Sequence, residues 1–380
     1  MKVLLAAGGS AGHVEPALTL ADTLRERDAD VEIVALGTST GIEASLVPER
    51  GYRFRAVPAY PWPRRPNRQA LGAPGRILGS IRAVRDALRD EAPDVVVGFG
   101  GYVAFPAYAA ARSLRIPIVV HEANSRPGLA DRVGARLTPW VAANVDGVLP
   151  HATRIGMPLR RSIRDLAVQS DEERQQTREK ARQRLGLASD RPTLLAFGGS
   201  LGARRINGAM AQAQGDFAAA GIQVIHLVGN GGHGLPESWP PSRGADDPAY
   251  LAMPYLTAMH EAFAAADAVV CRAGAMTCAE LAALGMPAVY VPLPVGNGEQ
   301  ELNAAPIIAH DGGVLIDDAD FDAVAIRDQV IPLVVDLPRC RRMGDRARSQ
   351  AVIDADERLV DMVLAAARLA PVRRTRKGDR

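Results

Sequence analysis

Cysteine and aromatic residues are scarce in this chain of 380 residues. The cysteines are Cys271, Cys278 and Cys340, and their spacing fits no CxxC pair. A disulfide scaffold and a cysteine-ligated metal site are therefore excluded, and we expect buried, unreactive thiols in a reducing compartment. Aromatic residues make up only 4%, and the formal net charge is +2. We expect no nucleic-acid partner, because the chain has neither base-stacking platforms nor a strong positive field.

Long uninterrupted apolar segments are also missing. Two long uncharged runs, Val95–Ala111 and Leu281–Gly298, each contain several glycines and at least one proline. Neither could form the unbroken apolar helix of about 20 residues that crosses a bilayer. Near the N-terminus, Lys2 is followed by only five apolar residues before Gly8, which is unlike a secretory signal. We therefore expect a cytosolic protein, or one that sits on a membrane from its cytosolic side.

The chain does contain a regular alternation of apolar strands and helical segments. Strands are predicted at residues 2–7, 31–36, 94–98, 116–120, 192–197, 224–228, 268–271 and 288–291. Apolar residues at helical spacing predict a helix from Pro16 to Arg27 and another over 359–369. The polar segment 171–184, between the two groups of strands, is interpreted as a solvated helix or a linker. This alternation is typical of parallel sheets that are covered by helices on both faces.

Two strand-to-turn segments are close copies of each other. LLAAGGSAG begins at Leu4, and LLAFGGSLG begins at Leu194, half a chain later. The duplication predicts two similar α/β domains, each opened by a glycine-rich turn from a strand into a helix. Ligands of open α/β sheets bind at the carboxyl ends of the strands. Two such domains facing each other would form a ligand-binding cleft between those ends.

Both turns also match G-x-S-x-G, the nucleophile elbow of α/β-hydrolases. A hydrolase needs one such serine, followed later by an acid and a histidine, so two equivalent copies fit that hypothesis poorly. Glycine-rich turns at helix N-termini suit the close approach of a phosphate instead. Neither turn is G-x-G-x-x-G and there is no Walker lysine, so the sequence indicates no dinucleotide cofactor.

The segment from Cys271 to Glu280 carries the most informative chemical signal. A strand ends, a turn of small residues follows, and a helix is predicted to begin near Ala275. The free N–H groups and the dipole of that helix terminus favour a diphosphate. Glu280, about one turn further on, could accept two hydrogen bonds from a ribose. A capping-type interaction with Thr277 explains Glu280 equally well from spacing alone.

His13 lies at the mouth of the first glycine turn, at the carboxyl end of a predicted strand. An imidazole there is a candidate general base near neutral pH, although a lone histidine is more often structural. His121 and Glu122 follow another strand in the same way. The Asp-x-Asp triplets at 28–30 and 354–356 lie in connecting or helical segments, so we expect no metal–diphosphate site there.

An arginine-rich segment with aromatic and aliphatic residues follows residue 60. It includes Trp62, Arg76, Ile77 and Leu78. Apolar side chains beside arginines suit the anionic surface of a bilayer. An ordinary loop followed by an amphipathic helix explains the same residues about equally well. The basic tail 371–380 is expected to be mobile.

Seven motifs, all in one order, connect the chain to a known family. They are GGSAGHVEPAL, GFGGYV, HEANSRPGLADR, GMPLRRSI, GGSLGARRIN, RAGAMTCAELAALGMPAVYVPLP and GEQELNA. From about Lys2 to Ala370 the chain resembles the MurG family of UDP-N-acetylglucosamine transferases, which convert lipid I to lipid II in peptidoglycan synthesis. The segment GNGEQ is similar to the corresponding segment of actinobacterial members. The resemblance implies a GT-B fold, an α/β architecture of two Rossmann-like parallel-sheet domains that face each other across a cleft.

The resemblance also implies that one domain binds the acceptor and the other binds the donor. Residues 1–160 would form an N-terminal, membrane-associated acceptor domain, with a C-terminal helix at about 350–370 packing back on it. Residues 161–349 would form the UDP-sugar donor domain. The implied enzyme is an inverting, UDP-GlcNAc-dependent hexosyltransferase that acts on the muramyl C4 hydroxyl of lipid I, without a cofactor or an obligatory metal.

The family's setting supplies further expectations. The enzyme would be a peripheral protein on the cytoplasmic face of the cell membrane. Its partners would be UDP-GlcNAc, undecaprenyl-linked lipid I, the anionic inner membrane surface and a cell-wall synthesis complex. Through lipid II it would serve cell-wall biogenesis, cell shape, cell division and the cell cycle.

Carried over position by position, the resemblance assigns residues to four roles. His13 would be the catalytic base. The donor would be bound by Ser10, Gly12, Asn124, Arg160, Ser200, Leu256, Gly274, Ala275, Met276, Thr277, Glu280, Glu299 and Gln300. The acceptor would be bound by Gly9, Gly12, Gly100, Gly101, Tyr102 and Glu122. The membrane would be contacted by Trp62, Arg76, Ile77 and Leu78.

Three positions depart from the family pattern. Leu201 stands where glutamine is usual, Asp131 where asparagine is common, and Ser10 where threonine is usual. Leu201 removes a side-chain amide from the donor site, which puts that contact in doubt. One alternative is a related transferase with another acceptor, such as a glycolipid or an antibiotic core. The other is a non-catalytic homologue that binds nucleotide sugars; Leu201 favours it, whereas His13 and Glu280 oppose it.

Overall fold

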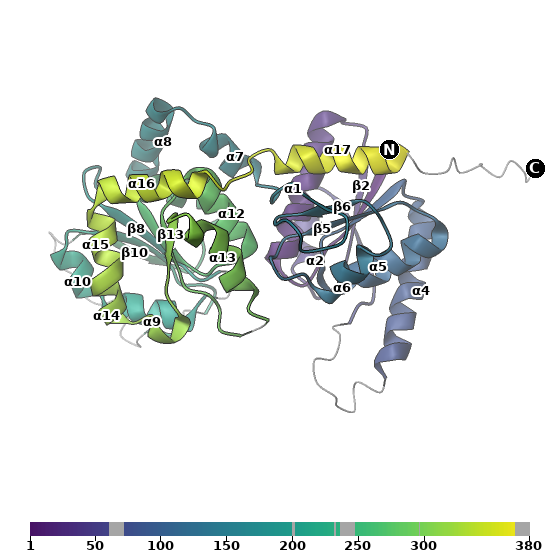
Figure 1. The fold of residues 1–380 in the computed structure, drawn as a ribbon, viewed down its shortest axis with the longest axis horizontal. Helices are drawn as coiled ribbons and strands as arrows, with labels where there is room; N and C mark the ends of the chain where they lie inside the picture. The colour runs from purple at the N-terminus through teal and green to yellow at the C-terminus, as the bar shows by residue number, and fades with distance from the viewer. Residues whose placement is uncertain (61–71, 200–201, 232, 236–247, 296, 369–380) are drawn as a thin grey trace, which may run out of the picture. The chain divides into compact units, whose positions relative to one another are not determined.

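The computed structural model divides the chain into two compact units (Figure 1). Unit 1 comprises Met1–Pro158 together with the segment from Asp354 onward, and unit 2 comprises Leu159–Ile353. The structure describes residues 1–60, 72–199, 202–231, 233–235, 248–295 and 297–368. Trp62, Ser200, Leu201 and the basic tail 371–380 therefore lie outside the described residues.

Unit 1 is built on a seven-stranded sheet with the order β3-β2-β1-β4-β5-β6-β7, and every neighbouring pair is parallel. Val3 of the central strand is in register with Ile33 on one side and Val95 on the other. The strands are β1 (Lys2–Ala6), β2 (Glu32–Gly37), β3 (Arg53–Ala56), β4 (Val95–Gly98), β5 (Ile118–Glu122), β6 (Val141–Ala143) and β7 (Ala152–Arg154).

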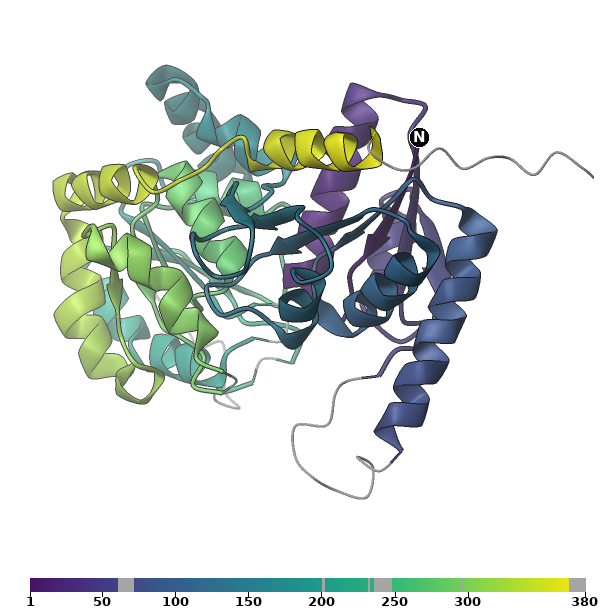
Figure 2. The same ribbon diagram turned by 45° about the vertical axis from the view of Figure 1, so that its right-hand side comes forward.

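Helices cover both faces of this sheet, because alternate residues of each buried strand point to opposite faces (Figure 2). Val3 and Leu5 pack in one core with the helices α1 and α17, whereas Leu4 and Ala6 pack in the other core with α4 and α5. The helices of unit 1 are α1 (Ala11–Arg27), α2 (Glu43–Glu49), α4 (Ala73–Glu91), α5 (Gly101–Leu114), α6 (Leu129–Gly134) and α17 (Ala355–Arg368).

The C-terminal helix α17 lies against α1, far from it in the sequence (Figure 1). The Thr23 hydroxyl of α1 donates to the buried carboxylate of Asp356 at 2.8 Å, and Arg27 forms an ion pair with Asp361. Helix α1 itself begins at Ala11, one turn earlier than the predicted start at Pro16. Pro16 thus lies inside α1, where its missing N–H leaves the carbonyl four residues earlier without its helical hydrogen bond.

Unit 2 repeats this plan with a six-stranded parallel sheet of order β10-β9-β8-β11-β12-β13. Its strands are β8 (Thr193–Phe197), β9 (Gln223–Leu227), β10 (Tyr250–Met253), β11 (Ala268–Cys271), β12 (Ala288–Tyr290) and β13 (Gly313–Leu315). Its helices are α7 (Arg161–Ala167), α8 (Asp171–Arg184), α9 (Arg204–Gln212), α10 (Gln214–Ala219), α11 (Met259–Ala265), α12 (Ala275–Leu284), α13 (Glu299–Ala309), η1 (Asp318–Asp320), α14 (Ala323–Ala325), η2 (Ile326–Val330), α15 (Ile331–Val335) and α16 (Leu337–Arg348).

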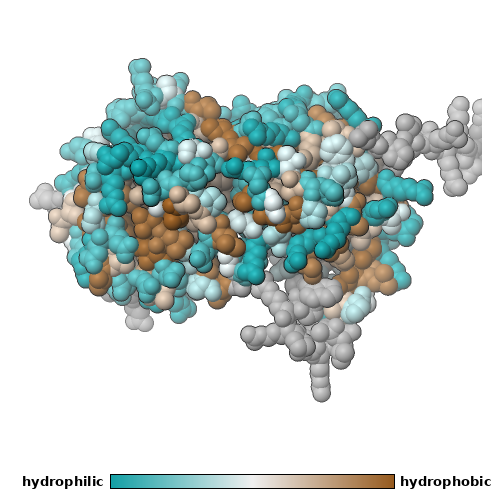
Figure 3. Space-filling view, viewed as in Figure 1, coloured by the Kyte–Doolittle hydropathy of each residue, from teal (hydrophilic) through white to brown (hydrophobic). Residues whose placement is uncertain are grey.

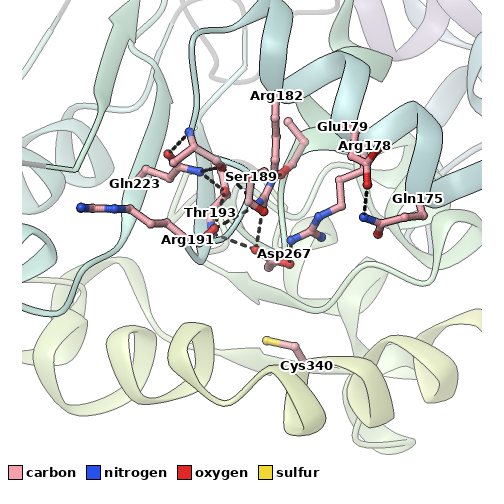
Figure 4. A network of polar contacts seen from close by, with 12 residues as sticks. Gln175, Arg178, Glu179, Arg182, Ser189, Arg191, Thr193, Gln223, Asp267 and Cys340 are labelled. Atoms are coloured by element: carbon pink, nitrogen blue, oxygen red, sulfur yellow. Dashed lines mark hydrogen bonds and ion pairs between the residues drawn. The ribbon is translucent and has the colours of Figure 1, made fainter.

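The polar segment 171–184 is a helix, α8, and not a linker. Ser170 and Glu173 form a capping box at its start. Near its end the Arg182 side chain is buried, and its guanidinium donates to the Asp267 carboxylate at 2.9 Å and to nearby backbone carbonyls (Figure 4). Asp267 also accepts from the N–H of Thr193 at 2.8 Å. This buried network fixes α8 to the amino ends of β8 and β11.

The prediction of two parallel α/β sheets is confirmed. In both units the first strand in the sequence has the second on one side and a later strand on the other, which creates a topological switch point. Open α/β sheets bind ligands at that point. The expectation of buried thiols is also confirmed, since all three cysteines are free and buried. Among the described residues, no helix has both the length and the apolar character needed to cross a membrane.

Candidate active site

The first glycine turn of unit 1 connects β1 to α1 at the switch point between β1 and β4. Gly9 has a φ of +89°, which favours glycine, and Ser10 is the N-cap of α1. His13 lies in the first turn of that helix, and its Nδ1 is 3.0 Å from the Ser10 hydroxyl. Gly12 is exposed, and a Cβ there would have no neighbour closer than the Ser10 hydroxyl at 3.8 Å. The turn therefore presents open backbone beside an imidazole.

A second glycine turn, between β4 and α5, packs directly against the first. A Cβ on Gly101 would lie 2.2 Å from the carbonyl oxygen of Gly8, so only glycine permits this contact. A Cβ on Gly100 would lie 2.9 Å from the Asp131 carboxylate and 3.2 Å from the His13 ring. The two turns thus bring His13 and Asp131 next to the same glycine, although the sequence separates them widely. Tyr102, which is 47% exposed, places its ring beside Gly9.

The electrostatic surroundings of His13 suit a group that gains and loses a proton. Burial lowers the pKa of its imidazole below the ordinary value of 6.5. A hydrogen bond to the carbonyl of Gly8 and the negative charge of Glu43 act in the opposite direction and raise the pKa. The ring is therefore neutral near neutral pH, and two groups stabilise the proton once it arrives. His121, by contrast, is buried within β5 against the carbonyl of Gly156, and burial lowers its pKa to about 4.

A buried carboxyl pair lies beneath the second glycine turn. Glu122 accepts from the N–H groups of Asn124 at 2.8 Å and Gly128 at 3.0 Å. Asp131 accepts from the Tyr108 hydroxyl at 2.7 Å. Burial raises the pKa of both carboxyls, and a hydrogen bond joins them, which requires one carboxyl to be protonated. Glu122 is therefore buried and held by backbone N–H groups beneath the second glycine turn.

We expect Asp131→Asn to make the protein more resistant to heat at alkaline pH. A carboxyl whose pKa is raised by folding stabilises the protein below its ordinary pKa, and this stabilisation is lost as the pH rises through the raised value. Asparagine does not titrate, so the variant should unfold at a higher temperature than the parent at about pH 8, by about 2–4 °C for each kcal/mol regained. Thermal unfolding between about pH 4 and pH 8 measures the difference in unfolding temperature between the variant and the parent. This difference should become smaller as the pH is lowered. A difference that stays constant over this range would contradict the shared-proton account.

The N-terminus of α12 is the corresponding feature of unit 2, at the end of β11. Gly274 is the N-cap, and α12 begins at Ala275, as predicted. The first N–H groups of a helix have no partner within it, so those of Ala275, Met276 and Thr277 are available to an anion. A Cβ on Gly274 would have no neighbour closer than 3.8 Å, which leaves the approach open. This terminus has the geometry of a diphosphate site.

Glu280 lies in the second turn of the same helix and is only 5% exposed. Its Oε1 is 3.4 Å from Nε of Arg160, the N-cap residue of α7. The N-cap of α12 is Gly274, so no side chain caps this helix at its N-cap position. The fold therefore unites Arg160 and Glu280, two donor-site candidates that the sequence separates by 120 positions.

The remaining donor-site candidates of unit 2 lie near the carboxyl ends of its strands. Glu299 and Gln300 form the first turn of α13, and the Gln300 side chain accepts from the N–H of Leu293 at 3.0 Å. Arg272, at the end of β11, donates to the carbonyls of Val291 and Pro292 and forms an ion pair with Asp318 at 2.6 Å. Arg272 thereby fixes the loop after β12. Leu256 follows β10 and is partly buried in the core under α12.

The candidates thus fall into two groups, one in each unit. Unit 1 unites Gly9, Ser10, Gly12, His13, Gly100, Gly101, Tyr102, Glu122 and Asn124 around its two glycine turns. Unit 2 holds Arg160, Leu256, Gly274, Ala275, Met276, Thr277, Glu280, Glu299 and Gln300. Ser10, Gly12 and Asn124, predicted for the donor site, therefore belong to a different unit from the other donor candidates. Sequence reasoning did not identify Glu43 or Tyr108, because their importance comes from packing and not from a motif.

Within the described residues, no metal-ligand cluster accompanies these groups. In the part of the chain that the structure describes, no three His, Cys, Asp or Glu side chains are placed to hold a metal ion together. Unit 1 offers backbone N–H groups, the His13 imidazole and a buried carboxyl pair. Unit 2 offers backbone N–H groups and the Arg160–Glu280 pair. Such a set can bind phosphates and move one proton.

Family models match both units. The Glycosyltransferase family 28 N-terminal domain matches residues 3–144, and the Glycosyltransferase family 28 C-terminal domain matches residues 193–359. Together the two matches span most of the chain, and each contains the glycine turn of its unit.

Similar proteins belong to the same kind of enzyme. The chain is 51% identical to a UDP-N-acetylglucosamine--N-acetylmuramyl-(pentapeptide) pyrophosphoryl-undecaprenol N-acetylglucosamine transferase of Acidothermus cellulolyticus, over 97% of this chain and 98% of the relative. It is 48% identical to the Streptomyces avermitilis protein of the same name, over 96% and 98%. Among solved structures, Acinetobacter baumannii MurG matches with a TM-score of 0.74 at 23% identity, covering 96% of this chain and 99% of that one.

Proposed function

The chain belongs to the MurG family within glycosyltransferase family 28, and from this membership we propose that it converts lipid I to lipid II. N-acetylglucosamine passes from UDP-N-acetylglucosamine to the C4 hydroxyl of the muramyl residue, and UDP is released. The donor is α-linked and the product β-linked, so the reaction inverts the anomeric carbon.

Unit 2 binds the donor in this proposal. The diphosphate lies at the N-terminus of α12, where the N–H groups of Ala275, Met276 and Thr277 meet its charge. The Glu280 carboxylate accepts hydrogen bonds from the ribose, and Arg160 keeps that carboxylate in place. As the bond between the sugar and the diphosphate breaks, negative charge grows on the leaving group. The helix terminus stabilises this charge without reorganising, so the proposal includes no obligatory metal.

Unit 1 binds the acceptor and removes its proton. The exposed backbone at Gly12 and the second turn at Gly100 receive the lipid-linked diphosphate, with Tyr102 at their edge. His13 takes the proton of the attacking hydroxyl, because burial keeps its ring neutral and the Gly8 carbonyl stabilises the proton once bound.

The observation that carries this proposal is the position of His13 where two glycine turns interlock. A hydrolase would use Ser10 as its nucleophile, but the family membership and the phosphate-binding geometry of unit 2 favour transfer. A transferase with another acceptor is the second candidate, because the donor half of such an enzyme would look the same. The solved calicheamicin glycosyltransferase CalG4, with a TM-score of 0.66, has the same overall fold.

Acceptor competition separates these two transferases. The purified protein is supplied with UDP-N-acetylglucosamine and either a lipid I analogue or an unrelated glycolipid, and UDP release is measured. UDP-glucose and UDP-N-acetylgalactosamine are then tested as alternative donors. The proposal expects release that depends on the lipid I analogue and prefers N-acetylglucosamine. Release that is faster with an unrelated glycolipid would favour the second candidate, and donor binding without release would indicate a non-catalytic homologue.

We further propose that unit 1 meets the anionic cytoplasmic face of the membrane through the start of α4. Leu78 is 47% exposed, Ile77 is partly exposed, and the Arg76 guanidinium stacks on the exposed ring of Tyr60 at 5.6 Å. Figure 3 shows apolar surface in the region of α4. Apolar side chains beside a cation suit a bilayer interface, and a polyprenyl-linked acceptor would be found there.

Leu78→Ser should weaken binding to vesicles that contain phosphatidylglycerol. Losing one exposed leucine removes about 1.5–3 kcal/mol of apolar burial at most, so the bound fraction should fall severalfold. Co-sedimentation measures that fraction, and Val335→Ser is the matched control, because Val335 is equally exposed but lies in unit 2. Equal binding by Leu78→Ser and the parent protein would exclude Leu78 from the contact.

A further inference from the structure

Behind the first glycine turn lies a carboxylate that no motif singled out. Glu43, the first residue of α2, is only 1% exposed. Its Oε1 accepts hydrogen bonds from the N–H and hydroxyl of Thr38 at 2.8 and 2.9 Å. Its Oε2 accepts from the N–H of Gly9 at 3.2 Å. All of these partners are donors, so the side chain is bound as an acceptor.

Three glycines make room for this one side chain. A Cβ on Gly8 would lie 2.8 Å from the Glu43 carboxylate, one on Gly41 would lie 2.3 Å from it, and one on Gly37 would lie 2.2 Å from its Cγ. These glycines come from the β1–α1 turn, the end of β2 and the loop before α2. A larger residue at Gly8 or Gly41 would require Glu43 to move, and one at Gly37 would require both Glu43 and the Phe54 ring to move. A buried charge enclosed in this way is costly to keep unless it is hydrogen-bonded, as it is here.

The carboxylate acts on the acceptor side in two ways. It accepts a hydrogen bond from the N–H of Gly9, so this N–H group is not offered to a phosphate. It also places a negative charge near His13, which lies four residues after Gly9 in the chain. The backbone N–H groups that remain available to the acceptor diphosphate are therefore those of the other residues in the two turns.

We propose that Glu43 is a positioning residue for the transfer reaction, holding the first glycine turn and stabilising the positive charge that His13 acquires. This inference rests on the proposed function. In the step concerned, the acceptor oxygen bonds to the anomeric carbon while its proton moves to the imidazole. The bond from that carbon to the diphosphate breaks, and its electron pair leaves with UDP. Charge on the imidazole therefore grows as the reaction proceeds, and a fixed negative charge nearby lowers the barrier.

Other titratable groups near His13 have different partners. Asp131, beyond Gly100, shares its proton with Glu122 and is bonded to Tyr108. On α1 itself, Glu15 forms an ion pair with Arg50 at 3.3 Å. Tyr102 packs beside Gly9. Of these groups and Glu43, the Glu43 charge is the one that raises the pKa of His13.

Glu43→Gln is the direct test, because it keeps the size of the side chain and removes the charge. We expect kcat to fall about tenfold, with the affinity for UDP-N-acetylglucosamine unchanged. The acid limb of the profile of kcat/KM against pH should move to lower pH, because the His13 imidazolium loses a stabilising charge. Glu43→Asp, which keeps the charge, should leave the acid limb near its original position. An acid limb of Glu43→Gln that coincides with that of the parent would overturn the inference.

Two further measurements keep the test decisive. If Glu43→Gln does not fold, Gly41→Ala displaces the carboxylate without removing it and should move the acid limb in the same direction; an unmoved limb would count against the inference. If the parent protein shows no acceptor-dependent release of UDP, the proposed function fails. The titration of the His13 ring by NMR then still tests the inferred charge effect, because it needs no turnover.

Discussion

Replacing His13 by alanine should lower kcat by about 10²–10⁴-fold, the usual contribution of a general base. The side chain lies where two glycine turns interlock, with Nδ1 held at 3.0 Å from the Ser10 hydroxyl. Burial lowers its pKa, so the parent enzyme should stay active until the pH falls below the ordinary histidine value of about 6.5. The acid limb reports protonation of the base, and it should disappear in His13→Ala. Initial rates of UDP release from about pH 5 to pH 9 measure both effects.

A change in the acceptor-side fold could imitate that loss, so the variant needs controls. Calorimetric binding of UDP-N-acetylglucosamine should be unchanged in His13→Ala, because the proposed donor groups lie in unit 2. His121→Ala is not a suitable comparison, since His121 is buried in β5 and its loss would damage the core. His310→Ala is the better control, because His310 is exposed in unit 2. Undiminished turnover by His13→Ala would remove His13 from the mechanism and leave the fold unaffected.

Glu280→Gln should weaken the binding of UDP-N-acetylglucosamine by about 10- to 100-fold. Hydrogen bonds to a charged group contribute about 1.5–3 kcal/mol, and the proposed contact joins a carboxylate to ribose hydroxyls. The variant keeps the shape of the side chain but also weakens its pairing with Arg160. Titration calorimetry with UDP-N-acetylglucosamine and with UDP measures the affinity, and Glu301→Gln on α13 controls for the loss of one negative charge.

The nucleotide itself separates a ribose contact from a structural role. With 2′,3′-dideoxyuridine diphosphate, which lacks the ribose hydroxyls, the parent and Glu280→Gln should bind with similar affinity, because the contact no longer exists. If Glu280 only orders Arg160 and α12, the variant should bind both nucleotides worse by the same factor. That second outcome would contradict the assignment of Glu280 to the ribose.

The parallel sheets were predictable because their central strands are continuous apolar runs. β1, β4, β8 and β11 are buried on both faces, and each stands out as a short Val-, Leu- or Ala-rich segment. Shorter strands, such as β7 (Ala152–Arg154), escaped prediction because three residues at a sheet edge carry no pattern. The sequence did not decide between a helix and a linker for α8, because its large buried side chain is a single arginine, Arg182, in a segment that is otherwise polar.

The candidate site was predictable where chemistry sits in a motif, and unpredictable where it depends on packing. The helix beginning at Ala275 and the histidine after the first turn follow from local sequence. The contact of Gly101 with the carbonyl of Gly8 joins segments more than 90 residues apart, so no local sequence pattern predicts it. The same holds for Glu43, whose role is visible only once three glycines from separate segments surround it. At these positions a glycine is required because a neighbouring group occupies the space of its Cβ, and not only because the backbone turns there.

The most direct test of the account is the stoichiometry and stereochemistry of one reaction. The purified protein is mixed with UDP-N-acetylglucosamine, labelled in the sugar, and a lipid I analogue, and both UDP and the labelled lipid are quantified. We predict one labelled lipid for each UDP released, with a β1→4 linkage by NMR and no release when the acceptor is omitted. Release of UDP without a labelled lipid, or a product with the α linkage of the donor, would contradict the assignment of an inverting transferase.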